Sequence, residues 1–270
     1  MAFWGHPARS FAIFQQRLIG YYRTMGLGRD HIKRPEGPQF MKSVLSVLAA
    51  AMLSVATSAA AQSPVVVELY TSQGCSSCPP ADAIFAELAQ RDDVIALALH
   101  VDYWDYIGWK DEFAVPAFAD RQRSYAAAAH RRSIYTPQMV VNGQTDIVGA
   151  RPMELSEAIA KHAAMPSPVT LDVTRQGDAL KISAQNTGAA GNMVVQLVRY
   201  TPMSNTRITR GENAGMTLDY ANVARDWQVL GTWDGRSDLS LNVPVTGDAP
   251  LVVLVQQGTD GAILAADAMR

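Results

Sequence analysis

The chain has 270 residues, of which 48% are hydrophobic and 18% charged, a composition typical of a globular protein rather than a disordered one. The formal net charge of −2 is uneven, because residues 1–61 carry seven basic and two acidic residues while the remainder is acidic. An acidic body repels a phosphate backbone, so the composition argues against nucleic acid as a partner.

The N-terminal residues predict export. Residues 41–61 combine a Met-Lys start, an apolar run and a small-residue sequence ending at Ala61, which together are typical of a cleaved secretory signal peptide. We expect residues 1–40 to be an upstream extension outside the fold, a basic leader being the alternative. The mature chain is then expected to be periplasmic or secreted. No later segment has the length and apolarity of a membrane span, so none is expected after signal removal.

Residues 62–164 are expected to form an α/β domain, because short apolar strands alternate with helical patterns. An aromatic-rich and helical insertion occupies residues 101–131, and Asn142-Gly143 is typical of a hairpin turn. The element order is that of a thioredoxin-like domain. In chain order the expected elements are strand 65–70, helix 80–90, strand 94–99, helix 116–129, strands 138–141 and 145–148, and helix 153–163.

A proline-containing linker near residues 165–168 precedes a change of pattern. From residue 168 onward, short segments of alternating apolar and polar residues are separated by Gly, Asp and Asn turns. This pattern predicts an all-β, sandwich-like C-terminal domain over residues 168–270. We expect this domain to serve in docking or dimerisation. The pattern does not indicate the oligomeric state. The expected strands are 169–173, 180–184, 193–200, 239–243, 251–256 and 263–266.

Cys75 and Cys78 are the two cysteines of the chain, and they lie between a predicted strand and a predicted helix. A disulfide between them would close almost no loop, which favours redox chemistry or metal binding over a structural cross-link. A helix N-terminus presents unpaired N–H groups and a positive dipole end, which favours a thiolate. We therefore predict that Cys75 is a nucleophile reachable from solvent, and that Cys78 is the resolving thiol.

Two other segments are expected to serve these cysteines. Thr136-Pro137 directly precedes a predicted strand, and we predict a cis peptide bond that faces the cysteines and offers a substrate-docking edge. The alternative is an ordinary proline at the start of a strand. Glu68 is an acid within an apolar strand and is a candidate proton relay for Cys78. The alternative is a glutamate that reaches solvent or an arginine.

The segment 100–110 contains two Trp and two Tyr residues. It predicts either a lid or recognition surface near the thiols, or a small satellite core under a long loop. His100 or His130 could complete a Cu(I) or Zn site with the two thiolates, although lone histidines are more often plain hydrogen-bonding residues. We assign no residue of the chain as a metal ligand. The chain has no glycine-rich phosphate loop, so no organic cofactor is expected.

The run from Glu68 to Asp82 reads Glu-Leu-Tyr-Thr-Ser-Gln-Gly-Cys-Ser-Ser-Cys-Pro-Pro-Ala-Asp. It resembles the secreted bacterial family called domain of unknown function 1223, and matching segments continue at 100–109 and 135–138. The resemblance covers essentially the whole mature chain. It implies a thioredoxin-like domain followed by a β-rich domain, with no settled activity. Gly74 is a departure from ordinary thioredoxins, which usually have tryptophan next to the first cysteine.

Together these features predict an exported thiol–disulfide oxidoreductase that acts on protein or small thiol substrates. Its partners would be exported protein thiols or disulfides, or another redox protein. Two alternatives stay open at this point. The same cysteine pair could bind Cu(I) for delivery to another exported protein, or the chain could be a non-catalytic thioredoxin-fold binding module. The sequence does not indicate the direction of electron transfer.

Overall fold

The computed structural model describes residues 63–189 and 191–270. The extension predicted for residues 1–40 and the signal peptide predicted for 41–61 lie outside these residues. No helix in the described part of the chain is long and apolar enough to cross a membrane. In chain order the elements are β1 (Val65–Thr71), α2 (Pro79–Leu88), β2 (Val94–His100), the 3-10 helix η1 (Asp105–Ile107), α3 (Pro116–Ala128), β3 (Gln138–Val141), β4 (Thr145–Val148), α4 (Pro152–Ala163), β5 (Val169–Gln176), β6 (Ala179–Asn186), β7 (Met193–Arg207), β8 (Thr217–Trp233), β9 (Leu239–Pro244), β10 (Leu251–Gln257) and β11 (Ile263–Met269).

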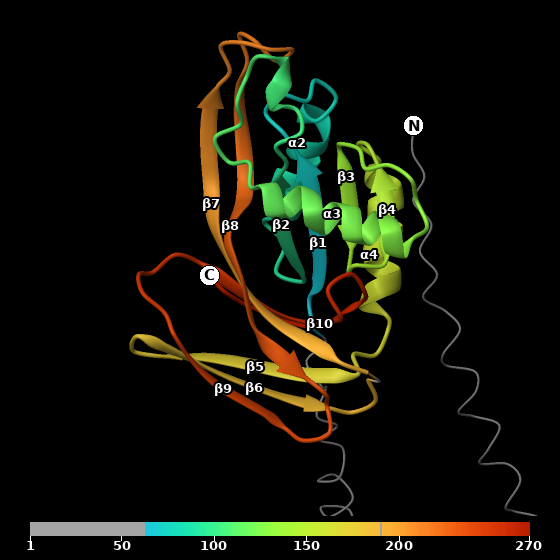
Figure 1. The fold of residues 1–270 in the computed structure, drawn as a ribbon, viewed down its shortest axis with the longest axis vertical. Coiled ribbons are helices and arrows are strands. Elements are labelled where there is room, and N and C mark those ends of the chain that lie inside the picture. Colours follow the sequence, from blue (N-terminus) through green and yellow to red (C-terminus); the bar gives the residue numbers. More distant parts are fainter. Residues whose placement is uncertain (1–62, 190) are drawn as a thin grey trace, which may run out of the picture. The chain divides into compact units, whose positions relative to one another are not determined.

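One mixed eight-stranded sheet runs through both halves of the described chain, in the order β11-β10-β7-β8-β2-β1-β3-β4 (Figure 1). Strand β2 is parallel to both of its neighbours, β1 and β8, and the other neighbouring strands are antiparallel. The predicted fold class, an α/β thioredoxin-like domain followed by an all-β domain, is therefore wrong. Three of the strands assigned to the second domain, β7, β10 and β11, continue the sheet of the first, and the described part of the chain is mostly β.

Strand β8 is the reason for this error. Residues 217–233 form a 17-residue strand that pairs antiparallel with β7 and joins β2 through the pair Ala98 and Val223. The Asn222 side chain strengthens this junction, because its Nδ2 donates a hydrogen bond to the carbonyl of Ala96 (3.0 Å). The buried positions of β8 lie between Tyr220 and Ala224, in its first half, and at Trp233, and the rest is exposed or half-buried. Such a strand has no periodic apolar run to reveal it.

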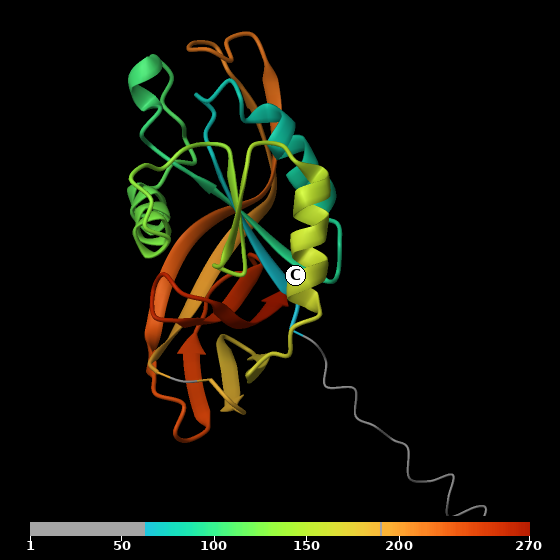
Figure 2. The ribbon, with the colours of Figure 1, turned by 90° about the vertical axis from the view of Figure 1, so that its right-hand side faces the viewer.

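The two faces of the sheet carry different layers, and Figure 2 shows α3 on one side with α2 and α4 on the other. Successive residues of a strand point to opposite faces, and β1 follows this rule. Val65, Val67 and Leu69 pack in the core beneath α2 and α4, whereas Val66 and Tyr70 pack beneath α3. The sheet therefore separates side chains that are neighbours in sequence.

A second sheet, in the order β5-β6-β9, covers the C-terminal part of the large sheet. Its core combines residues of β5 and β6 with residues of β7, β10 and β11. The packing is sandwich-like at this end, but one of the two layers is the eight-stranded sheet, which also contains β1, β2, β3 and β4 of the N-terminal half.

The β3–β4 hairpin forms as predicted, with its turn at Asn142-Gly143. Both turn residues have positive φ, 45° and 68°, which glycine adopts without steric cost. A Cβ atom at Gly143 would also lie 2.4 Å from the carbonyl oxygen of Gly261, so the close approach of these two loops requires glycine here.

Candidate functional site

The two cysteines form a disulfide at the start of α2, directly after β1. Backbone bonds build the loop: the Cys75 N–H donates to Ser72 and the Cys78 N–H donates to the carbonyl of Cys75. Cys78 is the N-cap residue, and Pro79 follows in the first helical turn, where a missing N–H breaks no hydrogen bond. The pair therefore lies at a helix N-terminus, as its position between strand and helix predicts.

The expectation that solvent reaches the sulfur atoms is wrong. Cys75 is 1% exposed and Cys78 is 0% exposed, whereas the two serines between them are exposed. Part of the cover comes from the aromatic insertion. A Cβ atom at Gly74 would lie 3.2 Å from Cβ of Trp104 and 3.3 Å from Cδ1 of Ile107. Glycine beside the first cysteine thus allows the insertion to pack directly on the cysteine loop.

The Thr136–Pro137 peptide bond is cis, as predicted. Tyr70 pairs with Gln138 across β1 and β3, so the cis bond lies at the end of the sheet where the cysteine loop begins. The indole Nε1 of Trp104 donates a hydrogen bond to Oγ1 of Thr136 (2.7 Å). Because Trp104 also borders Gly74, one aromatic side chain connects the proline loop with the cysteine loop. The docking of a substrate at this edge stays a prediction.

Glu68 is not brought together with Cys78. It lies on the face of β1 that α3 covers, whereas α2, which begins directly after Cys78, packs on the opposite face. Both carboxylate oxygens of Glu68 are already bound, one by Nε of Arg121 (2.7 Å) and the other by the hydroxyl of Tyr125 (2.7 Å). Its environment matches the alternative of a glutamate that reaches an arginine. We therefore do not retain Glu68 as a proton relay.

Further hydrogen bonds extend this pair into a buried network beneath α3, which we call the Glu68 network. Nη2 of Arg121 donates hydrogen bonds to the Tyr125 hydroxyl and to Oε1 of Gln256. The same Oε1 also accepts a hydrogen bond from Nε2 of Gln196. The Arg121 guanidinium also stacks 4.3 Å from the centre of the Trp227 ring. The network joins β1 and α3 to strands of the C-terminal half, which indicates a structural role.

Asp82 is a buried acid next to the disulfide that the sequence analysis did not single out. It lies one helical turn after Cys78, and its N–H donates to the Cys78 carbonyl (3.0 Å). Oδ1 accepts a hydrogen bond from Oγ1 of Thr71 (2.8 Å), while Oδ2 has no partner among the described residues. Burial raises the pKa of Asp82 to about 7, against the opposing effect of His100. This carboxyl group can therefore exchange a proton near neutral pH.

Three more side chains complete what we call the Asp82 cluster, namely His100, Asp111 and Tyr220. Nδ1 of His100 and Oδ2 of Asp111 are 2.7 Å apart, and the same carboxylate oxygen accepts the backbone N–H of Gln73 in the cysteine loop (2.8 Å). The Tyr220 ring lies 4.8 Å from the His100 ring. Nε2 of His100 and the hydroxyl of Tyr220, like Oδ2 of Asp82, are buried without a hydrogen-bond partner among the described residues.

Part of this cluster could have been found from the sequence. Residues four apart on a helix share a face, so Asp82 was an available partner for Cys78. Tyr220 was not available, because it enters from the unpredicted strand β8. The suggested metal ligands lie apart: His100 is buried beside Asp111, and His130 is exposed beyond the end of α3. The described residues contain no group of three or more His, Cys, Asp or Glu side chains placed to hold a metal ion.

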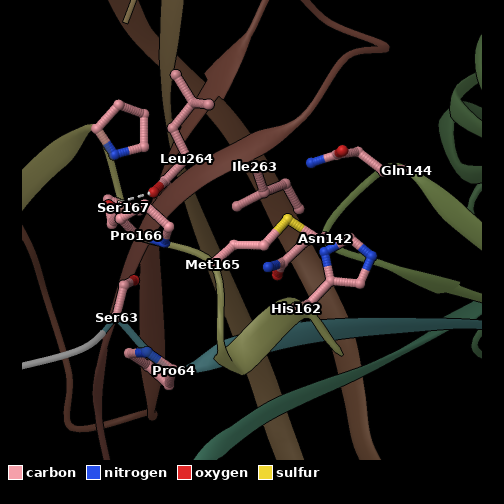
Figure 3. A pocket seen from close by; sticks show the side chains of 12 residues that line it. Ser63, Pro64, Asn142, Gln144, His162, Met165, Pro166, Ser167, Ile263 and Leu264 are labelled. Atoms are coloured by element: carbon pink, nitrogen blue, oxygen red, sulfur yellow. Dashed lines mark hydrogen bonds between the residues drawn. The ribbon is translucent and has the colours of Figure 1, made fainter. Parts of the chain in front are cut away.

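A hollow lies near the start of β1, at the end of that strand opposite the cysteines. Figure 3 shows Asn142, His162 and Met165 around it. Its polar groups already hold the fold together. Oδ1 of Asn142 accepts the N–H of Val66 (2.7 Å), and Nε2 of His162 lies 2.9 Å from Oγ1 of Thr145. We assign no chemistry to this hollow.

Comparison with known proteins places the chain in a family. The model of a family described as "Protein of unknown function (DUF1223)" matches residues 66–256. The chain belongs to the DUF1223 family. A crystal structure of protein AGR_C_4864 from Agrobacterium tumefaciens is 30% identical to this DUF1223 protein, over 76% of this chain and 93% of that chain, with a TM-score of 0.65.

A more distant likeness extends over a similar share of the chain. HBP35 of Porphyromonas gingivalis is 15% identical over 77% of this DUF1223 protein and 75% of its own chain, with a TM-score of 0.53. At this identity the likeness shows the fold alone. No curated protein matches the chain.

Proposed function

We propose that this DUF1223 protein is an exported thiol–disulfide oxidoreductase that uses Cys75 and Cys78 on protein or small thiol substrates. The observation that carries the proposal is the disulfide at the N-terminus of α2, one turn from a buried acid with a pKa of about 7. A disulfide that spans three positions adds little as a cross-link, so its value lies in its reactivity. Export to the periplasm or the exterior fits such a pair, because these compartments are oxidising.

The reaction needs only the cysteine pair and the substrate thiols. A substrate thiolate attacks Sγ of Cys75, which forms a mixed disulfide and releases Cys78 as a thiolate. A second substrate thiolate then attacks the substrate sulfur of the mixed disulfide, which forms the substrate disulfide and releases Cys75. Two electrons pass from the substrate to the cysteine pair. The reverse sequence reduces a substrate disulfide, and the relative reduction potentials set the direction.

We assign to Asp82 the proton that Cys78 gains when it leaves. Cys78 is buried, and a negative charge on a buried thiolate is energetically unfavourable. The leaving Cys78 thiolate therefore needs a nearby proton donor. Asp82 shares the helix face of Cys78 one turn away, and a pKa near the working pH is best for both giving and taking a proton. The hydrogen bond from Thr71 fixes one carboxyl oxygen and leaves the other free.

Exchange with a model substrate tests the proposal. The mature chain should oxidise a fluorescent dithiol peptide faster than an equal concentration of oxidised glutathione does. Cys75→Ser and Cys78→Ser should each reduce the rate at least about a hundredfold, since neither single thiol can complete the cycle. In the reverse direction, Cys78→Ser mixed with the disulfide form of the peptide should accumulate a mixed disulfide, because the Cys75 thiolate attacks the peptide disulfide, releases one peptide thiol and has no second cysteine to resolve the bond; mass spectrometry detects the adduct.

A matched control is Asn205→Ala, an exposed residue of β7 that bonds Asp219 on the same hairpin. It should keep the wild-type rate. An unchanged rate in Cys75→Ser, or no rate above that of oxidised glutathione in the wild type, would rule the proposal out.

A further inference from the structure

The turn of the β7–β8 hairpin, in the C-terminal half, contacts the loop that carries the disulfide. We call residues 208–216 the hairpin tip. Figure 1 shows this tip at the same end of the molecule as the start of α2. Nδ2 of Asn213 donates hydrogen bonds to the carbonyls of Gln73 (2.9 Å) and Cys75 (3.0 Å). Residues 138 and 140 positions apart in sequence thus meet at the cysteine loop.

The tip makes a second polar contact with the cysteine loop. Oγ of Ser76 donates a hydrogen bond to Oε2 of Glu212 (2.6 Å) at the surface. Gly211 lies against Trp109 of the insertion, where a Cβ atom would be 3.2 Å from Cβ of the tryptophan. The tip therefore rests on the cysteine loop and on the insertion together.

The tip has internal hydrogen bonds and little buried surface. Its ends are joined by backbone hydrogen bonds from Ile208 to Met216 and from Gly215 to Ile208. Ile208 and Asn213 are its buried residues, and most of the others are exposed. A segment with so little buried surface opens more readily than a core strand does. Opening needs the release of few contacts, those of Asn213 above all.

We propose that the hairpin tip is a lid that controls access to the Cys75–Cys78 disulfide, with the Asn213 side chain as its latch. This proposal rests on the proposed function and supplies what that function requires. A thiolate must reach Cys75, and Cys75 is buried while the lid is closed. A partner that binds the cysteine loop or the tip opens the lid, and the disulfide is shielded from other thiols until then.

The rate of reduction by a small reagent tests the lid without any substrate. The oxidised mature chain is mixed with dithiothreitol, quenched with a maleimide at set times, and the labelled thiols are counted by mass spectrometry. Asn213→Ala removes two hydrogen bonds to the loop, so the open population and the rate should rise about tenfold. Asn205→Ala, on the same hairpin but away from the cysteines, should react at the wild-type rate.

A second variant guards against a folding defect in the first. Glu212→Ala removes the surface contact with Ser76 and should speed reduction about threefold. The measurement is made at high salt, where the lost charge no longer affects an approaching thiolate. Unchanged rates in both variants, in chains that unfold at the wild-type temperature, would overturn the lid.

The outcomes separate this proposal from the proposed function. If Asn213→Ala is reduced faster and no variant catalyses peptide exchange, the lid proposal is supported and the oxidoreductase proposal is contradicted. If catalysed exchange depends on Cys75 and all lid variants are reduced at equal rates, the oxidoreductase proposal is supported and the lid proposal is contradicted.

Discussion

Two buried polar groups lie on opposite faces of the same sheet and differ in how well they are paired. In the Glu68 network beneath α3, both oxygens of Glu68 accept strong hydrogen bonds from Arg121 and Tyr125. In the Asp82 cluster beside α2, three buried polar atoms have no partner among the described residues. The Tyr70 hydroxyl borders the Glu68 network and is also unpaired, but no atom of the central carboxylate is.

The difference separates a structural role from a chemical one. Buried polar groups are normally paired, because an unpaired one loses its hydration without compensation. A paired network holds elements together, and its members are fixed by their bonds. An unpaired buried acid with a raised pKa lowers the stability of the fold, and acids with strongly shifted pKa values are found most often at functional sites. Both acids are buried beside β1, but only Asp82 has the properties of a reactive group.

The largest expected effect comes from breaking the Glu68 network. Arg121→Met leaves the Glu68 carboxylate buried without its counterion, which should cost about 3–5 kcal/mol in the free energy of unfolding. Urea unfolding followed by circular dichroism measures the loss. The double variant Arg121→Met with Glu68→Gln should recover part of it, because no buried charge remains. A loss below about 1 kcal/mol in the single variant would show that the pair is not structural.

Asp82 should make stability depend on pH in a defined direction. Its pKa is about 7 in the folded chain and 3.8 without burial, so between these values the folded state binds more protons than the unfolded state. The free energy of unfolding therefore falls as pH rises through this window, by up to about 1.4 kcal/mol for each pH unit. Above pH 7 the loss is complete.

Asp82→Asn should remove this slope, since the amide stays neutral. The wild type minus variant difference should change by a few kcal/mol between about pH 5 and pH 8, measured by urea unfolding at each pH. The nearby titratable groups, His100, Asp111 and Tyr220, are present in both chains, so their direct contributions largely cancel. Parallel pH profiles for the two proteins would contradict the assignment of Asp82.

A matched pair of smaller substitutions compares the two groups directly. The Tyr125 hydroxyl donates to the charged Glu68, so Tyr125→Phe should cost about 1.5–3 kcal/mol in the free energy of unfolding. Tyr220 is equally buried but its hydroxyl has no partner, so Tyr220→Phe should change the free energy of unfolding by less than about 0.5 kcal/mol or stabilise the chain. Equal losses in the two variants would erase the distinction between the groups.

Local signals in the sequence predicted local structure well. The strands 138–141 and 145–148 and the turn between them form as expected, and the cysteines lie at the start of a helix. Such local signals could not show on which face of the sheet Glu68 lies. Strand β1 is buried on both sides, so its apolar run has no alternation to show which residues face α2. The sequence therefore could not show that Glu68 lies on the face of β1 that α3 covers, where it binds Arg121 and Tyr125.

The sequence by itself determined where strand, cysteines and helix follow one another, because spacing, prolines and apolar runs act over a few residues. It also predicted the cis Thr136–Pro137 bond directly before the start of β3. Only the tertiary structure decided that one sheet unites both halves, because β8 is stabilised by pairing with β2 and β7 rather than by its own pattern. The burial of Cys75 was decided in the same way, since Trp104 and Asn213, which contact the loop around it, reach that loop only in the folded chain.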